Sequence, residues 1–238
     1  PGSCSMFDEI NEVQIDPNGY QHRWIDGSAM NMPVGKVVCV GRNYADHAKE
    51  LGNEVPDSPI LFMKPATALA SLHEPLALPE GQGPVHHEVE MVVLIGKRIR
   101  KETRLDHIRF SVAAYGIGLD LTLREVQNQL KEKGHPWERA KAFDGAAPVS
   151  GFIDARGISV RQDLGVTLEI NDEVKQHGHT GLMLFPTFEL LAEISQSFTL
   201  EPGDVVFTGT PAGVGPLNSG DKFTTRLGNI IQVFGSVA

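Results

Sequence analysis

Residues 86–96 place two carboxylates at the start of an apolar strand, and they constrain the fold more than any other segment. From Val89 onward the residues are mostly apolar and β-branched, which is typical of a buried strand. Glu88 and Glu90 are two positions apart, so on a strand they project to the same side. Neighbouring carboxylates repel each other, and burying them is costly unless a cation offsets their charge. The pattern fits either a divalent-metal site with oxygen ligands or a solvated strand end.

A third acid follows another apolar segment. Residues 114–121 are predicted to form a glycine-containing strand, and Asp120 stands near its end, where burial requires a partner. Together with Glu88 and Glu90, Asp120 makes an all-oxygen metal site possible. Three carboxylates without a sulfur ligand favour Mg²⁺ or Mn²⁺.

The composition is that of an ordinary globular protein. The 238 residues are 41% hydrophobic and 21% charged, and their length allows one large domain or two small ones. The formal net charge of −9 argues against a nucleic-acid surface. No apolar run reaches the roughly 18 residues of a membrane span, and the start lacks the basic and apolar segments of a secretory signal.

The cysteines and the first residues carry two further expectations. Cys4 and Cys39 are too few for a disulfide scaffold, and Cys39 lies in an apolar run. We therefore expect a buried thiol in a reducing compartment, which favours the cytoplasm. Residues 1–5 precede Met6 without any pattern, and we interpret them as a cloning remnant with Met6 as the natural start.

The expected elements describe a β-rich α+β fold, because strands outnumber helices and turns separate them. The 25 glycines and 15 prolines agree with many turns. We expect a strand pair within 12–32, a hairpin over 164–179 that turns at Asn171-Asp172, two short strands around Gly228, and single strands over 36–40, 61–65, 89–95, 114–121 and 205–207. Helices are expected over about 45–51, 105–113, 123–133 and 187–198.

Two of these helices carry detailed expectations. Thr122 is expected to cap the helix over 123–133, and Gly134 is expected to end it. In the helix over 105–113, the buried face is expected to consist of Leu105, Ile108 and Val112.

Four polar side chains have both a simple and a functional interpretation. His47 and Glu50 are three positions apart on a predicted helix, so they form either a solvated pair or a hydrogen-bonded dyad that acts as a general base. Lys64 precedes Pro65 and lies either on the surface or in a cleft. Lys141 has apolar neighbours and is either an exposed loop lysine or a fixed cation that can carry a proton.

Several common sites are excluded by their missing motifs. The chain has neither a dinucleotide-binding Gly-x-Gly-x-x-Gly after a strand nor the Gly-x-Ser-x-Gly of a serine hydrolase, and it has no Cys/His cluster with zinc spacing. The loop over 208–215 offers hydroxyls and backbone N–H groups to a carboxylate or phosphate, but it is not a P-loop.

Several motifs in order connect the chain to a known family. They are Gly41-Arg42-Asn43-Tyr44 with His47, Phe62-Met63-Lys64-Pro65, His87-Glu88-Val89-Glu90, Asp120 with Arg124 and Gln127, Lys141, and Pro202-Gly203-Asp204 with Thr208-Gly209-Thr210-Pro211. With these motifs the sequence resembles the fumarylacetoacetate hydrolase family, most closely its short members of the acylpyruvase and oxaloacetate decarboxylase type. The resemblance runs from about Lys36 to the C-terminus, and the first 35 residues are less diagnostic.

The resemblance implies a role for each motif residue. The implied metal ligands are Glu88, Glu90 and Asp120, with Mg²⁺ or Mn²⁺ as the cofactor. His47 and Glu50 are implied as the catalytic dyad, and Lys141 as the active-site lysine. The residues implied to bind substrate are Arg42, Lys64, Arg124, Gln127 and Thr210.

The resemblance also implies an architecture. The family fold is a mixed β-roll with a barrel-like core and a few peripheral helices, usually assembled as a homodimer. Residues 36–238 would form this catalytic domain, and residues 1–35 would add N-terminal strands. Longer members carry a separate N-terminal barrel domain, for which this chain is too short, so the short-chain activities are favoured over tyrosine-pathway fumarylacetoacetate hydrolysis.

The implied function is divalent-metal-dependent cleavage of a C–C bond in small 2-oxo acids, such as acylpyruvates, fumarylpyruvate or oxaloacetate, through a metal-stabilised enolate. The alternative is an isomerase or tautomerase of the 2-hydroxy-dienedioate or enol-oxaloacetate type, because the same enolate serves these reactions. A metal-stabilised binding protein without turnover is the non-enzyme alternative. The expected partners are a small 2-oxo acid and a second copy of the chain, without nucleic acid or membrane.

Overall fold

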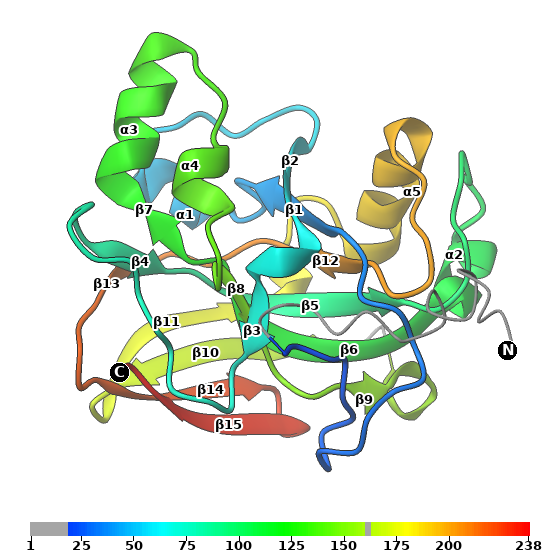
Figure 1. Ribbon diagram of the computed structural model, residues 1–238. Coiled ribbons are helices and arrows are strands. Elements are labelled where there is room, and N and C mark those ends of the chain that lie inside the picture. Colours follow the sequence, from blue (N-terminus) through cyan, green and yellow to red (C-terminus); the bar gives the residue numbers. More distant parts are fainter. Residues whose placement is uncertain (1–18, 160–162) are drawn as a thin grey trace, which may run out of the picture.

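The largest unit of the computed structural model, which describes residues 19–159 and 163–238, is a strongly curled sheet (Figure 1). Its strands are β1 (Val37–Gly41), β2 (Ile60–Lys64), β3 (Leu69–Ser71), β5 (Val89–Ile95), β6 (Val112–Leu119), β8 (Ala147–Val149), β9 (Ile153–Asp154) and β12 (Val205–Phe207). The order across the sheet is β2-β1-β12-β5-β6-β8-β3, and β9 pairs with β6. The pairs β1–β12 and β3–β8 are parallel, and the other neighbours are antiparallel. The expected β-rich α+β roll is confirmed.

The two faces of the curled sheet serve two cores. Cys39, Val92 and Phe207 belong to a compact cluster enclosed by the curl. Since successive strand residues point to opposite faces, Met91 and Val93 of β5 belong instead to a larger cluster on the other side. This alternation means that one strand can present different chemistry to each side.

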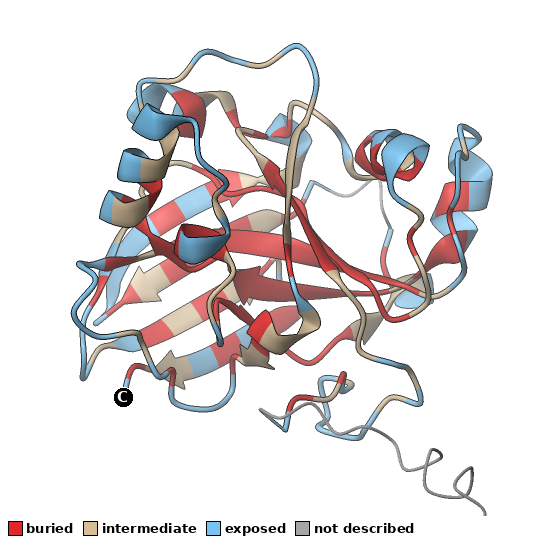
Figure 2. Cartoon of the chain, turned by 45° about the horizontal axis from the view of Figure 1, so that its top comes forward, coloured by how far each residue is buried: buried red, intermediate tan, exposed pale blue. Residues whose placement is uncertain are grey.

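A second sheet covers the larger cluster. It has the order β11-β10-β14-β15, and its strands are β10 (Gly165–Ile170), β11 (Glu173–His179), β14 (Lys222–Leu227) and β15 (Ile231–Ser236). Strands β10 and β14 pack on β5 and β6 of the curled sheet. Inward-facing residues such as Val166, Leu168 and Leu227 are completely buried there, and Figure 2 shows how the buried residues concentrate in the strands.

A third, small sheet and three helices close one end of the curl. This sheet has the order β13-β4-β7, and its strands are β4 (Val85–His87), β7 (Thr122–Leu123) and β13 (Gly215–Leu217). Helices α1 (Ala45–Glu50), α3 (Arg124–Lys133) and α4 (Glu138–Lys141) gather beside it. Helices α2 (Leu105–Ser111) and α5 (Thr187–Ser197) pack on each other at the other end (Figure 1). The short 3₁₀ turns are η1 (Ala66–Ala68), η2 (Ala155–Gly157) and η3 (Thr180–Leu182).

Two local turn predictions are confirmed. Asn171 and Asp172 both have positive φ angles, 50° and 67°, which is the backbone twist that a tight two-residue hairpin requires. Gly134 ends α3 in the left-handed conformation with φ 66°. In both places the residue types permit a conformation that most side chains disfavour.

Two expectations about helices are wrong. Thr122 does not cap α3, because it pairs with His86 in the small sheet and its hydroxyl donates to the carbonyl of Asp120. Helix α2 ends at Ser111, so Val112 begins β6, and Leu105 is 39% exposed instead of buried. In each case pairing with a distant strand decides the local conformation.

The strand pair expected within 12–32 is described from residue 19 onward, so its first part and residues 1–5 lie outside the described residues. Arg23 and Ala29 form one antiparallel bridge around the turn at Asp26-Gly27, which confirms the second part as a very short hairpin. His22 ties this segment to the main body through a hydrogen bond from its ring to the carbonyl of Gly203, 2.8 Å away. Among the described helices, none has the length and apolarity needed to cross a membrane.

Candidate active site

Three carboxylates converge at one end of strands β5 and β6. Glu88 joins β4 to β5, Glu90 is the second residue of β5, and Asp120 directly follows β6. The backbone N–H of Asp120 donates to the carbonyl of Glu88 over 2.8 Å, which aligns the two segments. Carboxylate oxygens of all three residues lie within 4.8 Å of one another, and each residue is at most 4% exposed. The solvated strand end is therefore excluded, and the expected convergence of the three acids is confirmed.

Lys64 lies behind Asp120 and is completely buried. Its Nζ is 2.6 Å from Asp120 Oδ1 and donates hydrogen bonds to the carbonyls of Ala146, at 2.6 Å, and Leu121, at 3.2 Å. The contact with Asp120 is an ion pair, and Asp120 Oδ1 accepts no hydrogen bond from a described residue. The surface interpretation of Lys64 is wrong. Its expected contact with substrate stays a prediction, because the structure places this cation where it orients Asp120.

Lys141 ends α4 and reaches the same carboxylates from the opposite side. It is 3% exposed, and its Nζ donates to Thr122 Oγ1 at 2.7 Å, Asp120 Oδ2 at 3.0 Å and Glu88 Oε2 at 3.3 Å. Burial alone would lower the pKa of Lys141, but the charges of Asp120 and Glu88 outweigh burial and raise it above the usual 10.5. The exposed-loop interpretation is wrong, and Lys141 is a fixed cation.

Arg124 begins α3 and holds Glu88 from a third direction. Its Nη2 lies 2.5 Å from Glu88 Oε1, its Nη1 donates to Gln127 Oε1 at 2.8 Å, and its Nε donates to His86 Nδ1 at 3.2 Å. Burial and the guanidinium of Arg124 lower the pKa of His86 to about 4, so the ring is a neutral acceptor at pH 7. The expected helical pairing of Arg124 with Gln127 is confirmed, and their contact with substrate stays a prediction.

Glu90 differs electrostatically from Glu88. Burial tends to raise the pKa of Glu88, but Lys141 and Arg124 outweigh it and hold that pKa well below 4.5. Glu90 forms no salt bridge with a described residue; it accepts one hydrogen bond, from the N–H of Gly209 at 2.7 Å. Burial and the charges of Asp120 and Glu88 raise the pKa of Glu90 well above 4.5. Glu90 therefore favours its protonated form unless another cation approaches.

A divalent cation fits this arrangement. The three acids supply only oxygen donors at mutual distances that one ion can bridge, and the unpaired Glu90 would be ionised by it. The formal charges of the three acids are balanced by Lys64, Arg124 and Lys141. A bound divalent ion would thus give the site two positive charges, which a dicarboxylate can neutralise.

The predicted dyad of α1 forms beside this cluster. His47 Nδ1 lies 3.2 Å from Glu50 Oε2, and His47 is 5% exposed. The other carboxylate oxygen of Glu50 accepts the N–H of Gly213 at 2.9 Å, which fixes the acid against the loop after β12. His47 is one of the lesser causes of the low pKa of Glu88, so the two side chains lie near each other. His47 is buried and Glu50 is exposed, so one member of the pair meets solvent, and the catalytic role of the pair stays a prediction.

Arg42 adds a cation on a constrained backbone. Its φ of 59° is left-handed, which costs a non-glycine residue of this kind about 1–3 kcal/mol and is common at functional sites. Asn43 holds the conformation: its side chain donates to the carbonyls of Thr208, at 2.7 Å, and Phe185, at 3.1 Å, and accepts the N–H of Phe185 at 2.7 Å. Arg42 has no described hydrogen-bond partner, so its guanidinium is available to a ligand. The importance of Asn43 became visible only in three dimensions.

Lys131 is a cation that the sequence did not indicate. Burial and the neighbouring charges of Arg42, Arg124 and Lys141 lower its pKa, which places it on the same positive side of the site. Its Nζ lies 5.2 Å from the ring centre of Trp137. An aromatic pair, Trp137 with Phe62 at 5.6 Å, separates it from Lys141, whose Nζ is 5.0 Å from the Phe62 ring. Two cations and two aromatic rings are thus neighbours beside the carboxylate cluster.

Gln176 of β11 joins the two halves of the site and was also missed. Its Oε1 accepts the N–H of Val89 at 3.0 Å and bonds to His87 Nδ1 at 2.9 Å. Its Nε2 donates to Thr210 Oγ1 and to the carbonyl of Pro211, both at 2.8 Å. The Thr210 hydroxyl in turn donates to the carbonyl of Val89 at 2.8 Å. The backbone between Glu88 and Glu90 is thereby fixed, and the expected substrate contact of Thr210 stays a prediction.

Comparison with known proteins gives this geometry a context. The family model described as "Fumarylacetoacetate (FAA) hydrolase C-terminal" matches residues 36–238. Oxaloacetate tautomerase YcgM of Escherichia coli is 52% identical over 206 residues, which are 86% of this chain and 94% of that protein.

Solved structures agree with the sequence comparison. A fumarylacetoacetate hydrolase family protein from Yersinia pestis superposes with a TM-score of 0.89 at 45% identity, covering 92% of this chain and 100% of that one. The fumarylpyruvate hydrolase from Pseudomonas aeruginosa, crystallised in complex with Mn²⁺ and pyruvate, has a TM-score of 0.84 at 34% identity and covers 90% and 94% of the two chains.

Proposed function

This chain belongs to the fumarylacetoacetate hydrolase family, and from that membership we propose that it catalyses the keto–enol tautomerisation of oxaloacetate with the help of Mg²⁺ or Mn²⁺. The observation that carries the proposal is the 52% identity to an oxaloacetate tautomerase that spans 94% of that relative. The charge balance of the site supports it, because a divalent ion would create a preference for a dicarboxylate. The reaction was the alternative expected from sequence, where C–C cleavage was preferred.

The metal has one assigned task. Held by Glu88, Glu90 and Asp120, it would act as a Lewis acid that stabilises negative charge on the keto oxygen. Mn²⁺ is named in the complex of the fumarylpyruvate hydrolase relative, and either ion suits an all-oxygen site.

His47 is the group we assign to proton transfer at the methylene carbon. Because its Nδ1 faces Glu50 at 3.2 Å, its Nε2 is the nitrogen that is free to accept the proton. The carboxylate of Glu50 stabilises the imidazolium that forms, and the N–H of Gly213 keeps that carboxylate in place. In the enol-forming direction His47 then delivers this proton to the former keto oxygen, and in the reverse direction it takes the proton from the enol hydroxyl and gives it to the carbon, so neither direction needs a water attack.

Cationic side chains are assigned to the substrate carboxylates and the developing enolate. Arg42 is free of described hydrogen bonds and would take one carboxylate. The contact of Lys141 to Glu88 is the longest of its three, at 3.3 Å, so a substrate oxygen would replace it most easily. Lys141 would then donate to the oxygen that becomes negative.

A second candidate is the cleavage of fumarylpyruvate or another acylpyruvate. It is favoured by the 34% identity to a fumarylpyruvate hydrolase across 94% of that chain. In this reaction His47 would activate a water molecule for attack on the distal carbonyl. As further family expectations, we propose a homodimer and a cytoplasmic location.

Proton NMR in deuterium oxide separates the two reactions. With oxaloacetate and Mg²⁺, we expect accelerated exchange of the methylene hydrogens and accelerated decay of the enol, without added pyruvate formation. His47→Asn should reduce the exchange rate by at least about a hundredfold, the usual contribution of a general base, while Mn²⁺ binding is kept. Faster consumption of fumarylpyruvate than exchange of oxaloacetate would reverse the order of the two candidates, and full activity in EDTA would contradict both.

A further inference from the structure

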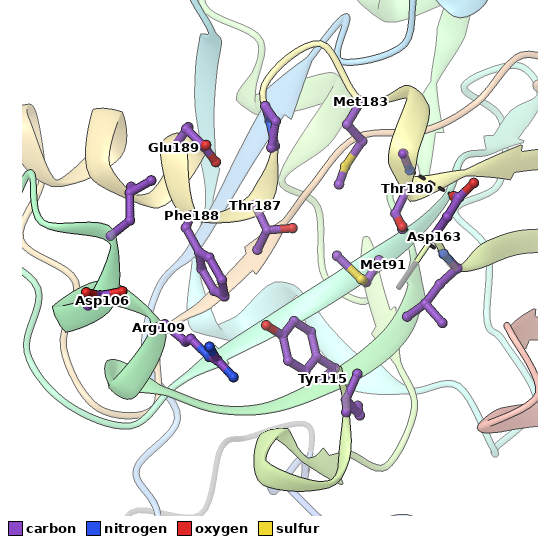
Figure 3. A pocket seen from close by; sticks show the side chains of 15 residues that line it. Met91, Asp106, Arg109, Tyr115, Asp163, Thr180, Met183, Thr187, Phe188 and Glu189 are labelled. Carbon is purple, nitrogen blue, oxygen red and sulfur yellow. Dashed lines mark hydrogen bonds between the residues drawn. The ribbon is translucent and has the colours of Figure 1, made fainter. Parts of the chain in front are cut away.

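An open cavity of about 500 Å³ lies between α2, α5 and the middle of β5 and β6 (Figure 3). Its volume is within the range of small-molecule sites. Met91 lines it, whereas Glu90, the next residue along β5, belongs to the carboxylate cluster. Because neighbouring strand residues point to opposite faces, the cavity and the candidate active site lie on opposite faces of the curled sheet.

The tyrosine at the floor of the cavity has an unused hydroxyl. Tyr115 is 2% exposed, and Figure 3 shows its hydroxyl pointing into the cavity. No described residue forms a hydrogen bond with this hydroxyl, which meets the open space of the cavity, where a ligand can reach it. Burial raises the pKa of Tyr115 above its usual 10, so the group stays a neutral donor. A ligand atom that accepts a hydrogen bond would satisfy it.

Two positive features adjoin this hydroxyl. Arg109 lines the cavity beside Tyr115 and forms no salt bridge with a described residue. The first turn of the 11-residue helix α5, from Thr187 on, forms another wall, and no side chain caps it. Its unpaired N–H groups favour an anion, and the exposed carboxylate of Glu189 in the same turn offsets part of the helix dipole. The Tyr115 hydroxyl, the Arg109 guanidinium and the N–H groups of the first turn of α5 therefore all line the same cavity.

The remaining wall and the rim restrict the ligand further. Met91, Met183 and Phe188 supply an apolar surface beside the donors. Asp106, Asp163 and Glu189 lie at the exposed rim, where they would repel a second negative charge on the ligand.

We propose that this cavity is a second ligand site, which binds a small amphipathic monocarboxylate with its carboxylate between Tyr115, Arg109 and the α5 N-terminus and its apolar tail against Met91, Met183 and Phe188. The site is distinct from the one proposed for oxaloacetate, since it prefers a single charge and an apolar body. Its occupancy is measured by binding, so the result does not depend on the catalysed reaction.

The test uses a matched ligand series on the complete protein. Isothermal titration with hexanoate, hexanol, hexylamine and adipate varies the head group and the charge at similar chain length. We expect hexanoate to bind most tightly to this cavity. Tyr115→Phe should weaken its binding by at least about tenfold, the loss expected for a hydrogen bond to a charged group. Arg109→Gln should have a similar effect, whereas Arg100→Gln, which removes an exposed arginine outside the cavity, should leave binding unchanged.

A second readout protects the test from a folding artefact. Because the Tyr115 hydroxyl has no described partner, Tyr115→Phe should not lower the unfolding temperature of the ligand-free protein. The proposal is overturned if hexanoate does not bind at millimolar concentration, if it binds both cavity variants as tightly as the wild type, if hexylamine binds better, or if Tyr115→Phe is clearly destabilised.

Discussion

Lys64 Nζ lies 2.6 Å from Asp120 Oδ1, and the two side chains are 0% and 1% exposed. This contact joins the end of β2 to the segment after β6, so it connects distant parts of the curled sheet. Charges buried to this degree have lost their hydration, and each depends on the other for compensation. The pair therefore matters for folding as well as for the orientation of a candidate metal ligand.

We predict that Lys64→Met lowers the free energy of unfolding by about 3–5 kcal/mol, because it leaves Asp120 buried beside fewer cations. Urea denaturation measures the change. Lys175→Met is the matched control, since it removes an exposed ion pair with Glu173 and should cost less than about 1 kcal/mol. Adding Asp120→Asn to Lys64→Met should recover part of the loss. Equal costs for Lys64→Met and Lys175→Met would contradict the assigned importance of burial.

Metal affinity should increase with pH. The pKa of Glu90 is raised in the metal-free protein, so a metal must displace a proton from Glu90 at pH values below that raised pKa. Mn²⁺ binding should therefore strengthen by at most about tenfold per pH unit and become constant above the pKa. Calorimetry in buffers with different ionisation enthalpies counts the released proton. An affinity that does not change with pH would show that Glu90 is already ionised without metal.

The raised pKa of Glu90 also makes the stability of the metal-free protein depend on pH. Protonated Glu90 contributes stability that is fully present below pH 4.5, the ordinary pKa, and this contribution is lost as the pH rises through the raised value. Saturating Mn²⁺ should therefore increase the unfolding temperature more at high pH than at low pH.

Gln176→Leu should weaken Mn²⁺ binding while the fold persists. The substitution leaves the N–H of Val89 and the His87 ring without their partner, and each unsatisfied group costs about 1–3 kcal/mol. We expect the Mn²⁺ affinity to fall even at temperatures where the variant is fully folded, because Val89 lies between Glu88 and Glu90. Gln196→Leu, on the exposed side of α5, should change neither quantity. Unchanged metal affinity in Gln176→Leu would remove this residue from the site.

Cys39 should resist alkylation in the folded protein. It is completely buried, and burial together with the charge of Asp120 raises the pKa of its thiol well above the usual 9.0. Iodoacetamide at pH 8 should modify Cys39 only after unfolding in urea, because the thiolate is the reactive form. Peptide mass spectrometry distinguishes Cys39 from Cys4. Rapid modification of Cys39 without denaturant would mean that the enclosed core opens frequently.

The parts of the site that depend on short sequence distances were predictable. Glu88 and Glu90 are two residues apart on a strand, and His47 and Glu50 are three apart on a helix, so the regular geometry of each element brings each pair together. The turn at Asn171-Asp172 followed in the same way from residues that tolerate positive φ. The third acid, Asp120, was added because a buried acid at a strand end needs a partner, whereas a family resemblance was needed to connect Lys141 with these carboxylates.

The missed parts depend on contacts between distant segments. Gln176 bonds to groups 87 and 89 residues earlier, so no local pattern marks it. Asn43 lies in a recognised motif, but its bonds to groups 142 and 165 residues later, which give it its role, cannot be read from the motif. Thr122 has the chemistry of a helix cap, but pairing with His86 keeps it in a strand. In the sequence Lys131 looks like an ordinary surface lysine. Only the structure shows that it lies near Arg42, Arg124 and Lys141.

Glu90 and Met91 are consecutive residues of β5 that point to opposite faces of the curled sheet. Glu90 points to the candidate metal site, and Met91 lines the amphipathic cavity. The carbonyl of Met91 accepts both the N–H of Thr208, at 3.1 Å, and its hydroxyl, at 2.7 Å, so the strand is tethered at this point. Substitutions of the Met91 side chain can therefore change the shape of the cavity while the position of the Glu90 carboxylate is kept. A protein engineer could exploit this separation by changing the ligand preference of the cavity and the metal preference of the carboxylate site independently of each other.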